Sequence, residues 1–370
     1  MTLSDLALWI GIGLAGVAAV LLIRSTVWKV LSTYRLRMAG PRPLRASHHR
    51  LWRDPGRVEA LSLVYGPGGR DGAPAAPFTF LEEHDTGSQP CLSVRDGRGR
   101  TWRLKWGHEA RVEAFAVRLA WACGYFAEIT HFVPSGVIEQ ATDLKRTRHC
   151  VDAADGTFMD ARFEADNPEV RKFFEAHSWS WDDNPFLGTR ELSGLKIVMM
   201  LLSNWDSKDR RDVARGSNTA IFEARAGRWP RVHREAQYLL TDWGGSMGKW
   251  GSNIVTRGRW DVDGFEVQTP QFVTGVKEGR VLFGYTGQRT ADIAGDIPVD
   301  HARWFHGYAG RITERQLVEG LLASGATDDE ATRFARALVE RIRQLGRFTA
   351  GSAVNNVLVS AFRRTRQRSG

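Results

Sequence analysis

The alternation of hydrophobic and polar positions predicts a β-rich region in the first half of the chain. Three short runs rich in β-branched and aromatic residues follow one another: "FTFLEEH" (78–84), "CLSVRD" (91–96) and "TWRLKWG" (101–107). The segments between them, "DTGSQP" and "GRGR", consist of turn-forming residues. Strands joined by short turns pair with their neighbours, so we expect an antiparallel meander. A fourth run, "ITHFVPSGVIE" (129–139), is also expected to be extended.

Helical spacing replaces the alternation directly after the meander. Over 109–123 the apolar residues Val112, Phe115 and Leu119 recur three or four positions apart, which is typical of one buried helix face. Gly124 follows this run in the position that favours the end of a helix. The sequence therefore predicts a helix that begins just after the third strand.

The second half of the chain is expected to mix strands and helices. The expected elements are a buried helix over 190–202, strands at 218–224 and 236–245, and an apolar helical run at 353–362. Two capping-box sequences, "TERQ" (313–316) and "TDDE" (327–330), indicate that the C-terminal third is helical. The segment 140–187 is polar with aromatic islands, and its pattern predicts no element.

The N-terminus holds an apolar stretch long enough to span a membrane. Residues 6–23, "LALWIGIGLAGVAAVLLI", contain no charged side chain and match the thickness of a bilayer core as a helix. Only Asp5 is charged before this stretch, whereas 24–50 carries six arginines, one lysine and no acidic residue. This asymmetry favours a single-pass helix in the cytoplasmic (inner) membrane, with the rest of the chain facing the cytoplasm. A cleaved signal peptide is the alternative, but its positive charge normally precedes the apolar stretch.

Composition and charge narrow the choice of partners. The chain has 370 residues, 42% hydrophobic and 25% charged, which is ordinary for a globular protein, and a formal net charge of +9. Much of the positive charge lies in 24–50 and in the tail "RRTRQR" (363–368), so anionic lipid headgroups explain it more simply than nucleic acid. No sequence signature of a nucleic-acid-binding domain is present. The three cysteines form no paired motif and leave the redox compartment open.

Charged residues stand at the ends of the predicted elements in an informative order. Lys105 ends a strand, and Glu113 lies on the helix that follows. Asn204 and Asp206 leave a buried helix in "NWDSK", and Asp242 ends a strand before two glycines in "TDWGGSMG". Phosphoryl transfer from ATP needs these types: a lysine for phosphates, a glutamate to hold that lysine, and carboxylates for Mg²⁺ or Mn²⁺ and for the acceptor hydroxyl.

Each of these residues also has an ordinary structural explanation. Lys105 can be a solvated side chain on a strand, and Glu113 can pair within its helix. Asp206 can end a helix by binding its own backbone, and Asp242 can belong to a strand-ending turn. Their joint order within one chain favours the functional interpretation. A zinc-protease helix is excluded, because Val112 stands where the second histidine after His108-Glu109 belongs.

The same fragments resemble the atypical protein-kinase-like superfamily. The likeness is to bacterial HipA-type toxin kinases and to secretory-pathway kinases of the Golgi casein-kinase type, and it covers about 78–250. "TGSQPCLSV" (86–94) is similar to the phosphate loop of the toxin kinases, which implies phosphate contacts from Thr86, Gly87 and Ser88. "NWDSK" looks like the catalytic loop, and "TDWGGSMG" looks like the metal motif. The resemblance implies a bacterial-type, membrane-anchored member of this superfamily.

The sequence departs from the family pattern at two positions. Such loops carry a second metal ligand five residues after the catalytic aspartate, where this chain has Arg211. Asp209, Asp212 or Asn218 are the candidates to replace it, and we take Asn218. Cys91 stands where the toxin kinases tend to have lysine. These departures bear on activity more than on fold.

The sequence thus predicts an α+β protein with a bilobal kinase-like fold. We expect a short N-terminal segment (1–5), a transmembrane helix (6–23), a basic juxtamembrane segment (24–50), a β-rich lobe (51–140), a mainly helical lobe (141–362) and a basic tail (363–370). In this interpretation ATP and Mg²⁺ or Mn²⁺ bind between the lobes, and the acceptor is a hydroxyl, preferably on a protein. AMP transfer, a pseudokinase that acts as a scaffold, and an unrelated interaction domain are the alternatives.

Overall fold

The computed structural model describes most of the chain after its N-terminal segment. The described residues are 44–85, 89–107, 109–167, 170–174, 178–206, 218–227, 232–251 and 257–366, with backbone only at 350–366. The predicted transmembrane helix at 6–23 and the basic segments at 24–43 and 367–370 therefore lie outside this part. Within the described residues, no helix combines the length and the apolar character that a membrane crossing needs.

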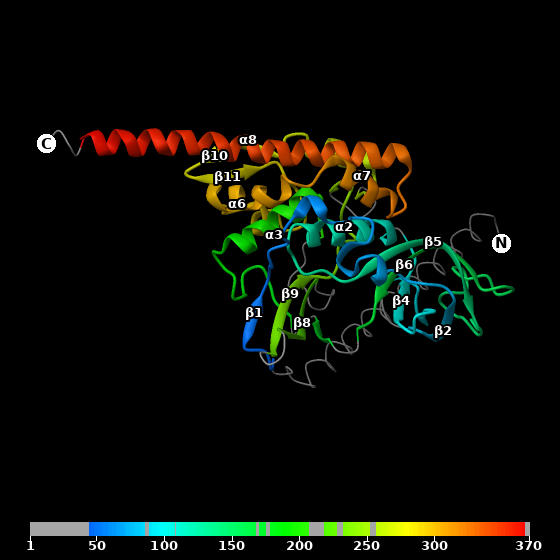
Figure 1. The fold of residues 1–370 in the computed structure, drawn as a ribbon. Helices are drawn as coiled ribbons and strands as arrows, with labels where there is room; N and C mark the ends of the chain where they lie inside the picture. The colour runs from blue at the N-terminus through cyan, green and yellow to red at the C-terminus, as the bar shows by residue number, and fades with distance from the viewer. Residues whose placement is uncertain are drawn as a thin grey trace, which may run out of the picture.

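Five strands form a closed β-barrel at one end of the molecule (Figure 1). Around the barrel they are β2 (Phe78–Glu83), β3 (Cys91–Arg95), β4 (Thr101–Lys105), β6 (Thr157–Ala165) and β5 (Thr130–Glu139). β2, β3 and β4 pair antiparallel in sequence order, so the predicted meander is confirmed. β5 confirms the extended run predicted after it.

Alternation along the strands decides which side chains fill the barrel. On β4, Trp102 and Leu104 are fully buried in the barrel core. Lys105 follows Leu104 and therefore projects from the opposite face of the sheet. On β6, Phe163 packs in the same core while its neighbours Arg162 and Glu164 are buried on the other side. These two residues of β6, which face outward from the barrel, are charged, and they are nevertheless buried.

A second sheet lies beside the barrel and has mixed strand directions. Its order is β1 (His48–Arg50), β9 (His233–Leu240), β8 (Thr219–Ala226) and β7 (Arg171–Phe174). β1 runs parallel to β9, and the other pairs are antiparallel. β8 and β9 lie where two strands are predicted, and the end of β9 brings the chain to Asp242.

Two helices link the sheets to the helical part of the molecule. α2 (Ala110–Ala122) is buried on nearly every side, and it ends before Gly124, whose φ of 93° is in the left-handed region. α3 (Arg190–Leu201) begins at Thr189, whose hydroxyl accepts a hydrogen bond from the Leu192 amide at 3.2 Å. Both helices confirm the sequence predictions at 109–123 and 190–202.

The remaining helices form a layer that α8 crosses from end to end (Figure 1). They are α4 (Val262–Gln268), α5 (Thr290–Ala294), α6 (Val299–Ala309), α7 (Glu314–Leu322) and α8 (Asp328–Arg366), besides short 3-10 turns at Val58–Ala60, Gly66–Gly68 and Arg70–Gly72. Both capping boxes are confirmed. Thr313 and Gln316 bond reciprocally before α7, and the pair Thr327 and Glu330 does so before α8.

The structure corrects two expectations about the second half of the chain. The C-terminal third is not wholly helical, because β10 (Val273–Lys277) and β11 (Arg280–Phe283) form a hairpin. Glu278 and Gly279 both have positive φ at its turn, which matches the twist of paired strands. The segment 140–187, where no element is predicted, contains β6 and β7, so residues beyond the expected lobe boundary at 140 close the barrel. The α+β class is confirmed.

Candidate active site

Three carboxylates meet where the barrel, α2 and the second sheet come together. Glu109 is the N-cap residue of α2, Glu113 lies in its first turn, and Asp242 follows β9. One carboxylate oxygen of each lies within 4.8 Å of the others. Hard divalent cations such as Mg²⁺ and Mn²⁺ prefer oxygen ligands of this kind. Glu113 and Asp242 are sequence-predicted site residues, and Glu109 joins them as a third.

Backbone geometry brings these acids together. Glu109 and Glu113 are four residues apart and therefore share one helix face. A Cβ at Gly244 would lie 2.6 Å from the carboxyl carbon of Glu109, so the glycine lets the chain after β9 approach α2. The Gly244 amide donates to Oδ1 of Asp242 at 3.0 Å, which fixes the orientation of that carboxylate. The first glycine of "DWGG" thus leaves room for the Glu109 carboxylate.

Lys105 lies beside this acidic cluster, defined as Glu109, Glu113 and Asp242. Burial lowers the pKa of Lys105, Arg162 lowers it further, and Glu164 and Asp242 act in the opposite direction. Lys105 makes no hydrogen bond or ion pair with any residue that the structure describes. It is therefore a nearly buried amine close to carboxylates, with its donors available to a ligand.

Arg162 is the residue that contacts Glu113. It lies directly opposite Lys105 in the β4–β6 register and forms an ion pair with Glu113. A second ion pair joins it to Glu164 at 2.8 Å. The expected pairing of Lys105 with Glu113 is wrong for this structure, because the ion-pair partner of Glu113 is Arg162. Two cationic side chains, Lys105 on β4 and Arg162 on β6, therefore lie at the site, whereas the sequence analysis predicts only Lys105.

A row of alternating basic and acidic side chains continues from Arg162 away from the cluster. Lys172 lies 3.9 Å from Glu164 and 3.1 Å from Glu128, and all three side chains are largely buried. Burial opposes the charge on Glu164, but the surrounding cations, first Arg162 and then Lys105 and Lys172, together outweigh it and lower the pKa of Glu164 to about 2. Burial and the like charge of Glu164 raise the pKa of Glu128 to about 8. These contacts hold Arg162 on the side that faces away from the acidic cluster.

Glu109 has a separate cationic partner. Burial, and then the like charge of Asp242, raises the pKa of Glu109. Arg259 opposes this effect with an ion pair of 2.7 Å from the segment that follows Asp242. The guanidinium of Arg259 also lies 5.1 Å from the ring centre of Trp205. The acidic cluster is therefore compensated by one arginine on each side.

The described residues that follow α3, 202–206, are buried. Ser203 has a φ of 49°, and this left-handed residue turns the chain out of the helix. The Asn204 side chain accepts a hydrogen bond from the Asp206 amide at 3.1 Å, and Tyr285 donates to the Asn204 carbonyl. Arg341 donates to the Leu201 carbonyl at 2.6 Å and so satisfies the end of the helix.

The same loop contacts the chain that carries Asp242. The Trp205 amide donates to the Gly245 carbonyl at 3.0 Å, and the Asn204 side chain reaches the Asp242 carbonyl at 3.5 Å. A Cβ at Gly245 would lie 2.7 Å from the Cβ of Asp206. Asn218, the predicted second metal ligand, donates its side-chain amide to the Asp206 carbonyl. The structure thus groups Asn204, Asp206 and Asn218 with Asp242.

Several predicted residues lie outside the described part of the chain. Thr86, Gly87 and Ser88 of the expected phosphate loop are among them, as is Arg211. Cys91, at the end of that loop, opens β3 and pairs in register with Lys105. Burial raises the pKa of the Cys91 thiol, so it is a small buried neighbour of Lys105 rather than a second cation.

Glu109 and Arg162 are not predicted as site residues from the sequence, although each lies in a pattern that could have indicated its position. Glu109 lies four residues before Glu113, the spacing of one helix face. Arg162 lies in "TFMDARFEA" (157–165), where aromatic and polar residues alternate as in a strand with two buried faces. That alternation is short and interrupted at Asp160, whose φ is 51°.

Comparisons with known proteins give one likeness at the level of structure. No family model and no curated protein matches the chain. A crystal structure of the Golgi casein kinase with Mn/ADP bound aligns over 74% of this chain and 73% of that chain, with 11% sequence identity and a TM-score of 0.33. A TM-score below 0.5 does not establish a shared fold, so we base the function on the side chains themselves.

Proposed function

We propose that this protein is a kinase-like phosphotransferase that binds ATP with Mg²⁺ or Mn²⁺ and phosphorylates a hydroxyl acceptor. The convergence of the acidic cluster, two cationic side chains and the buried Asp206 carries this proposal. Phosphoryl transfer is mostly positioning and charge neutralisation, and these groups supply both. In this proposal the barrel and the helical part act as the two lobes of a kinase-like fold.

Each part of the site has a separate task in nucleotide binding. Glu109, Glu113 and Asp242 would hold the divalent cation, which neutralises phosphate charge when bound. Lys105 would donate to phosphate oxygens, because an ammonium group attracts an anion more strongly in a buried site than in water. Asn218 is our candidate for a second metal ligand through its side-chain oxygen.

Asp206 is the proposed general base. In the transfer, the acceptor hydroxyl loses its proton to Asp206, its oxygen forms the new bond to the γ-phosphorus, and the bond to the β-phosphate oxygen breaks to release ADP. Asn204 braces Asp206 through the hydrogen bond from the Asp206 amide. A hydrogen bond from the Trp205 amide to the Gly245 carbonyl links the two loops.

The substitution Asp206→Asn tests this assignment. We expect the full-length chain to hydrolyse ATP slowly with Mg²⁺ or Mn²⁺, with water as the acceptor. Asp206→Asn should reduce this rate by roughly 10² to 10⁴-fold while nucleotide binding persists, because only proton transfer is removed. Phosphate release and calorimetric binding measure the two quantities separately. An unchanged rate in the variant would refute the role of Asp206.

A pseudokinase is the second candidate, and one observation favours it. Arg162 and Arg259 occupy both glutamates of the cluster, so a cation must compete with two guanidinium groups. Binding of ATP without turnover in the wild-type chain would identify this alternative. The protein would then be a nucleotide-binding or scaffolding module.

The acceptor and the location remain proposals from the sequence. We propose a protein hydroxyl as the acceptor, and a membrane anchor formed by residues 6–23 with the kinase-like part in the cytoplasm. The charge asymmetry around that stretch supports this orientation, and the basic residues after it are expected to contact anionic lipid headgroups. Reporter fusions at each terminus test the orientation.

A further inference from the structure

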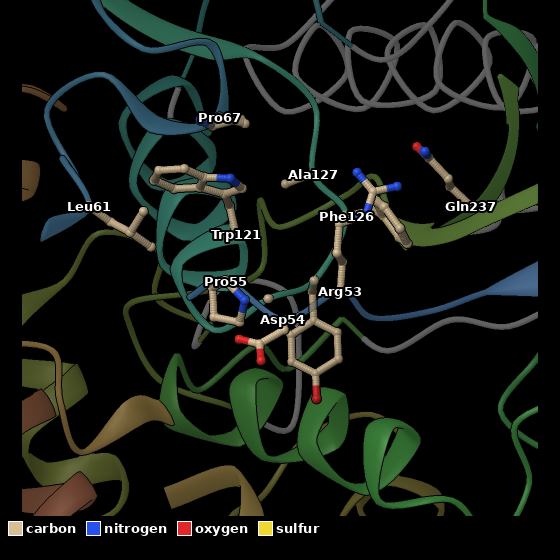
Figure 2. Close-up of a pocket in the computed structure, with 11 residues that line it drawn as sticks. Arg53, Asp54, Pro55, Leu61, Pro67, Trp121, Phe126, Ala127 and Gln237 are labelled. Carbon is tan, nitrogen blue, oxygen red and sulfur yellow. The ribbon is translucent and has the colours of Figure 1, made fainter. Parts of the chain in front are cut away.

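A second hollow lies at the opposite end of α2 from the acidic cluster. It has a volume of about 390 Å³, at the small end of the range of ligand pockets. Its walls come from the chain after β1, from the last turn of α2 and the residues that follow, and from β9 (Figure 2). Trp121 lies on α2 two turns after Glu113, and the helix rises about 1.5 Å per residue, so roughly 12 Å of helix separates the two sites.

One side of this α2 pocket is apolar and flat. Leu61, Pro67 and Trp121 form that side, with the indole of Trp121 as its largest surface (Figure 2). Trp121 is partly exposed on a helix whose other residues are mostly buried, and it lines the pocket. An indole that lines a pocket favours a planar ring as its partner.

The other side of the pocket carries an arginine with unused donors. The Arg53 guanidinium lies 5.2 Å from the ring centre of Phe126 and donates through Nη2 to Glu235 at 2.8 Å. Its side chain is 54% exposed, so the remaining N–H groups can reach a ligand. Glu235 also pairs with Arg50 at 2.9 Å. One carboxylate thus faces two arginines, which leaves positive charge at this side of the pocket.

Asp54 limits how much negative charge the ligand can carry. It lines the same pocket, and its Oδ1 accepts the Gly56 amide at 2.8 Å. A ligand with two negative charges would be repelled by this carboxylate, whereas one with a single carboxylate can face Arg53 alone. The size, the flat wall and the charges therefore select a small aromatic monoanion.

We propose that the α2 pocket binds a small aromatic monocarboxylate, with its ring on Trp121 and its carboxylate on Arg53. This inference does not depend on the proposed function, because none of the pocket residues belongs to the acidic cluster or the Asp206 loop. Binding in the pocket is therefore expected to survive Asp242→Asn.

The test compares two probes of equal shape on the full-length chain. Indole-3-acetate and its neutral amide, indole-3-acetamide, are titrated by saturation-transfer NMR. We expect the acid to bind roughly tenfold more tightly than the amide, since only the acid pairs with Arg53. Arg53→Gln should remove that difference, and Trp121→Leu should weaken both probes. Arg70→Gln is the matched control, because Arg70 also lies over an aromatic ring, Tyr65, but outside the pocket.

Conservative variants separate a lost contact from a lost fold. Arg53→Lys and Trp121→Phe are expected to keep most of the binding, because they retain the charge and the ring. Equal affinity for the acid and the amide, or binding that Arg53→Gln and Trp121→Leu leave unchanged, would overturn the proposal. Tighter binding of phenyl phosphate than of either indole probe would overturn the monocarboxylate assignment.

Discussion

At the scale of single residues, Arg162 is a buried cation whose charge must be compensated inside the protein. It is 3% exposed and lies between two carboxylates, those of Glu113 and Glu164, that are also buried. Removing one partner of a buried ion pair leaves an uncompensated charge in a medium that solvates it poorly. Here one guanidinium pairs with both acids, so its loss affects both, although Lys172 also lies near Glu164.

The substitution Arg162→Met should therefore be strongly destabilising. We expect the free energy of unfolding to fall by about 3–5 kcal/mol, measured by urea denaturation. Combining it with Glu113→Leu should recover part of that loss, because one of the stranded charges is removed. Arg103→Met, an exposed arginine one strand position from Leu104, is the control and should have little effect. A loss equal to that of the control would mean that Arg162 is not a buried partner.

The sequence predicts most of the site's residue types but not their pairing. Lys105, Glu113, Asp206 and Asp242 are found because each ends or begins a recognisable element. Arg162 cannot be assigned a partner from the sequence, because its contact with Glu113 depends on the register between β4 and β6. A shift of one residue in that register would turn it to the other face.

At the scale of elements, the glycines after β9 set the distance between two loops. Gly244 allows Glu109 to approach, and Gly245 allows the Asp206 loop to approach. Neither has a positive φ, so their role is space rather than backbone conformation. The loops come within contact because both positions lack a side chain.

The substitution Gly245→Ala tests this packing. The added Cβ would lie 2.7 Å from the Cβ of Asp206, so the loop must move. A displacement of about 1 Å can cost roughly 100-fold in turnover, and we expect ATP hydrolysis to fall by that order. Gly307→Ala in α6 is the matched control, since no atom lies within 4 Å of its new Cβ. Full activity in Gly245→Ala would contradict this account of the loops.

Elements with complete local signals are the ones that sequence analysis predicts. α7 and α8 begin at capping boxes, and α2 ends at a glycine in the left-handed region. The hairpin of β10 and β11 is missed because its short strands lie between helices in a region read as helical. Its "KEGR" turn has positive φ at two positions, Glu278 and Gly279, and only the second is a glycine. A single glycine is a weak sequence signal for such a turn.

At the scale of the whole molecule, stability should depend on pH through a buried histidine. His131 is 5% exposed, lies 5.9 Å from Trp102 between ring centres, and is close to Arg118. Burial, and then the charge of Arg118, lowers the pKa of His131 to about 3. Below its ordinary pKa of 6.5, the unfolded chain binds a proton that the folded chain does not. Stability contributed by this residue is therefore lost as the pH falls.

Substitution of His131 should flatten that dependence. Between pH 7 and pH 5 we expect the wild-type chain to lose about 2 kcal/mol more than His131→Gln, measured by urea denaturation at each pH. His48→Gln, on the exposed strand β1, should follow the wild type. Parallel pH profiles for the wild type and His131→Gln would show that the histidine is not kept neutral by the fold.

The overall architecture is only partly accessible from the sequence. The α+β class and the order of the site residues along the chain follow from local patterns. Closure of the barrel does not, because it requires β6, from a segment without a clear pattern, to pair with both β4 and β5. The acidic cluster depends on that closure, since β6 brings Arg162 to α2.

The most direct test of the central claim is a thermal-shift titration of the full-length chain with ATP and Mg²⁺ or Mn²⁺. Wild type is compared with Asp242→Asn and with Asp143→Asn, a control at an exposed position with a φ of 56° that asparagine tolerates. At a hundred times the dissociation constant, a ligand adds about 2.7 kcal/mol of stability. We predict metal-dependent stabilisation of the wild type and the control that disappears in Asp242→Asn. No stabilisation at millimolar nucleotide, or an equal effect in Asp242→Asn, would contradict a nucleotide site at the acidic cluster.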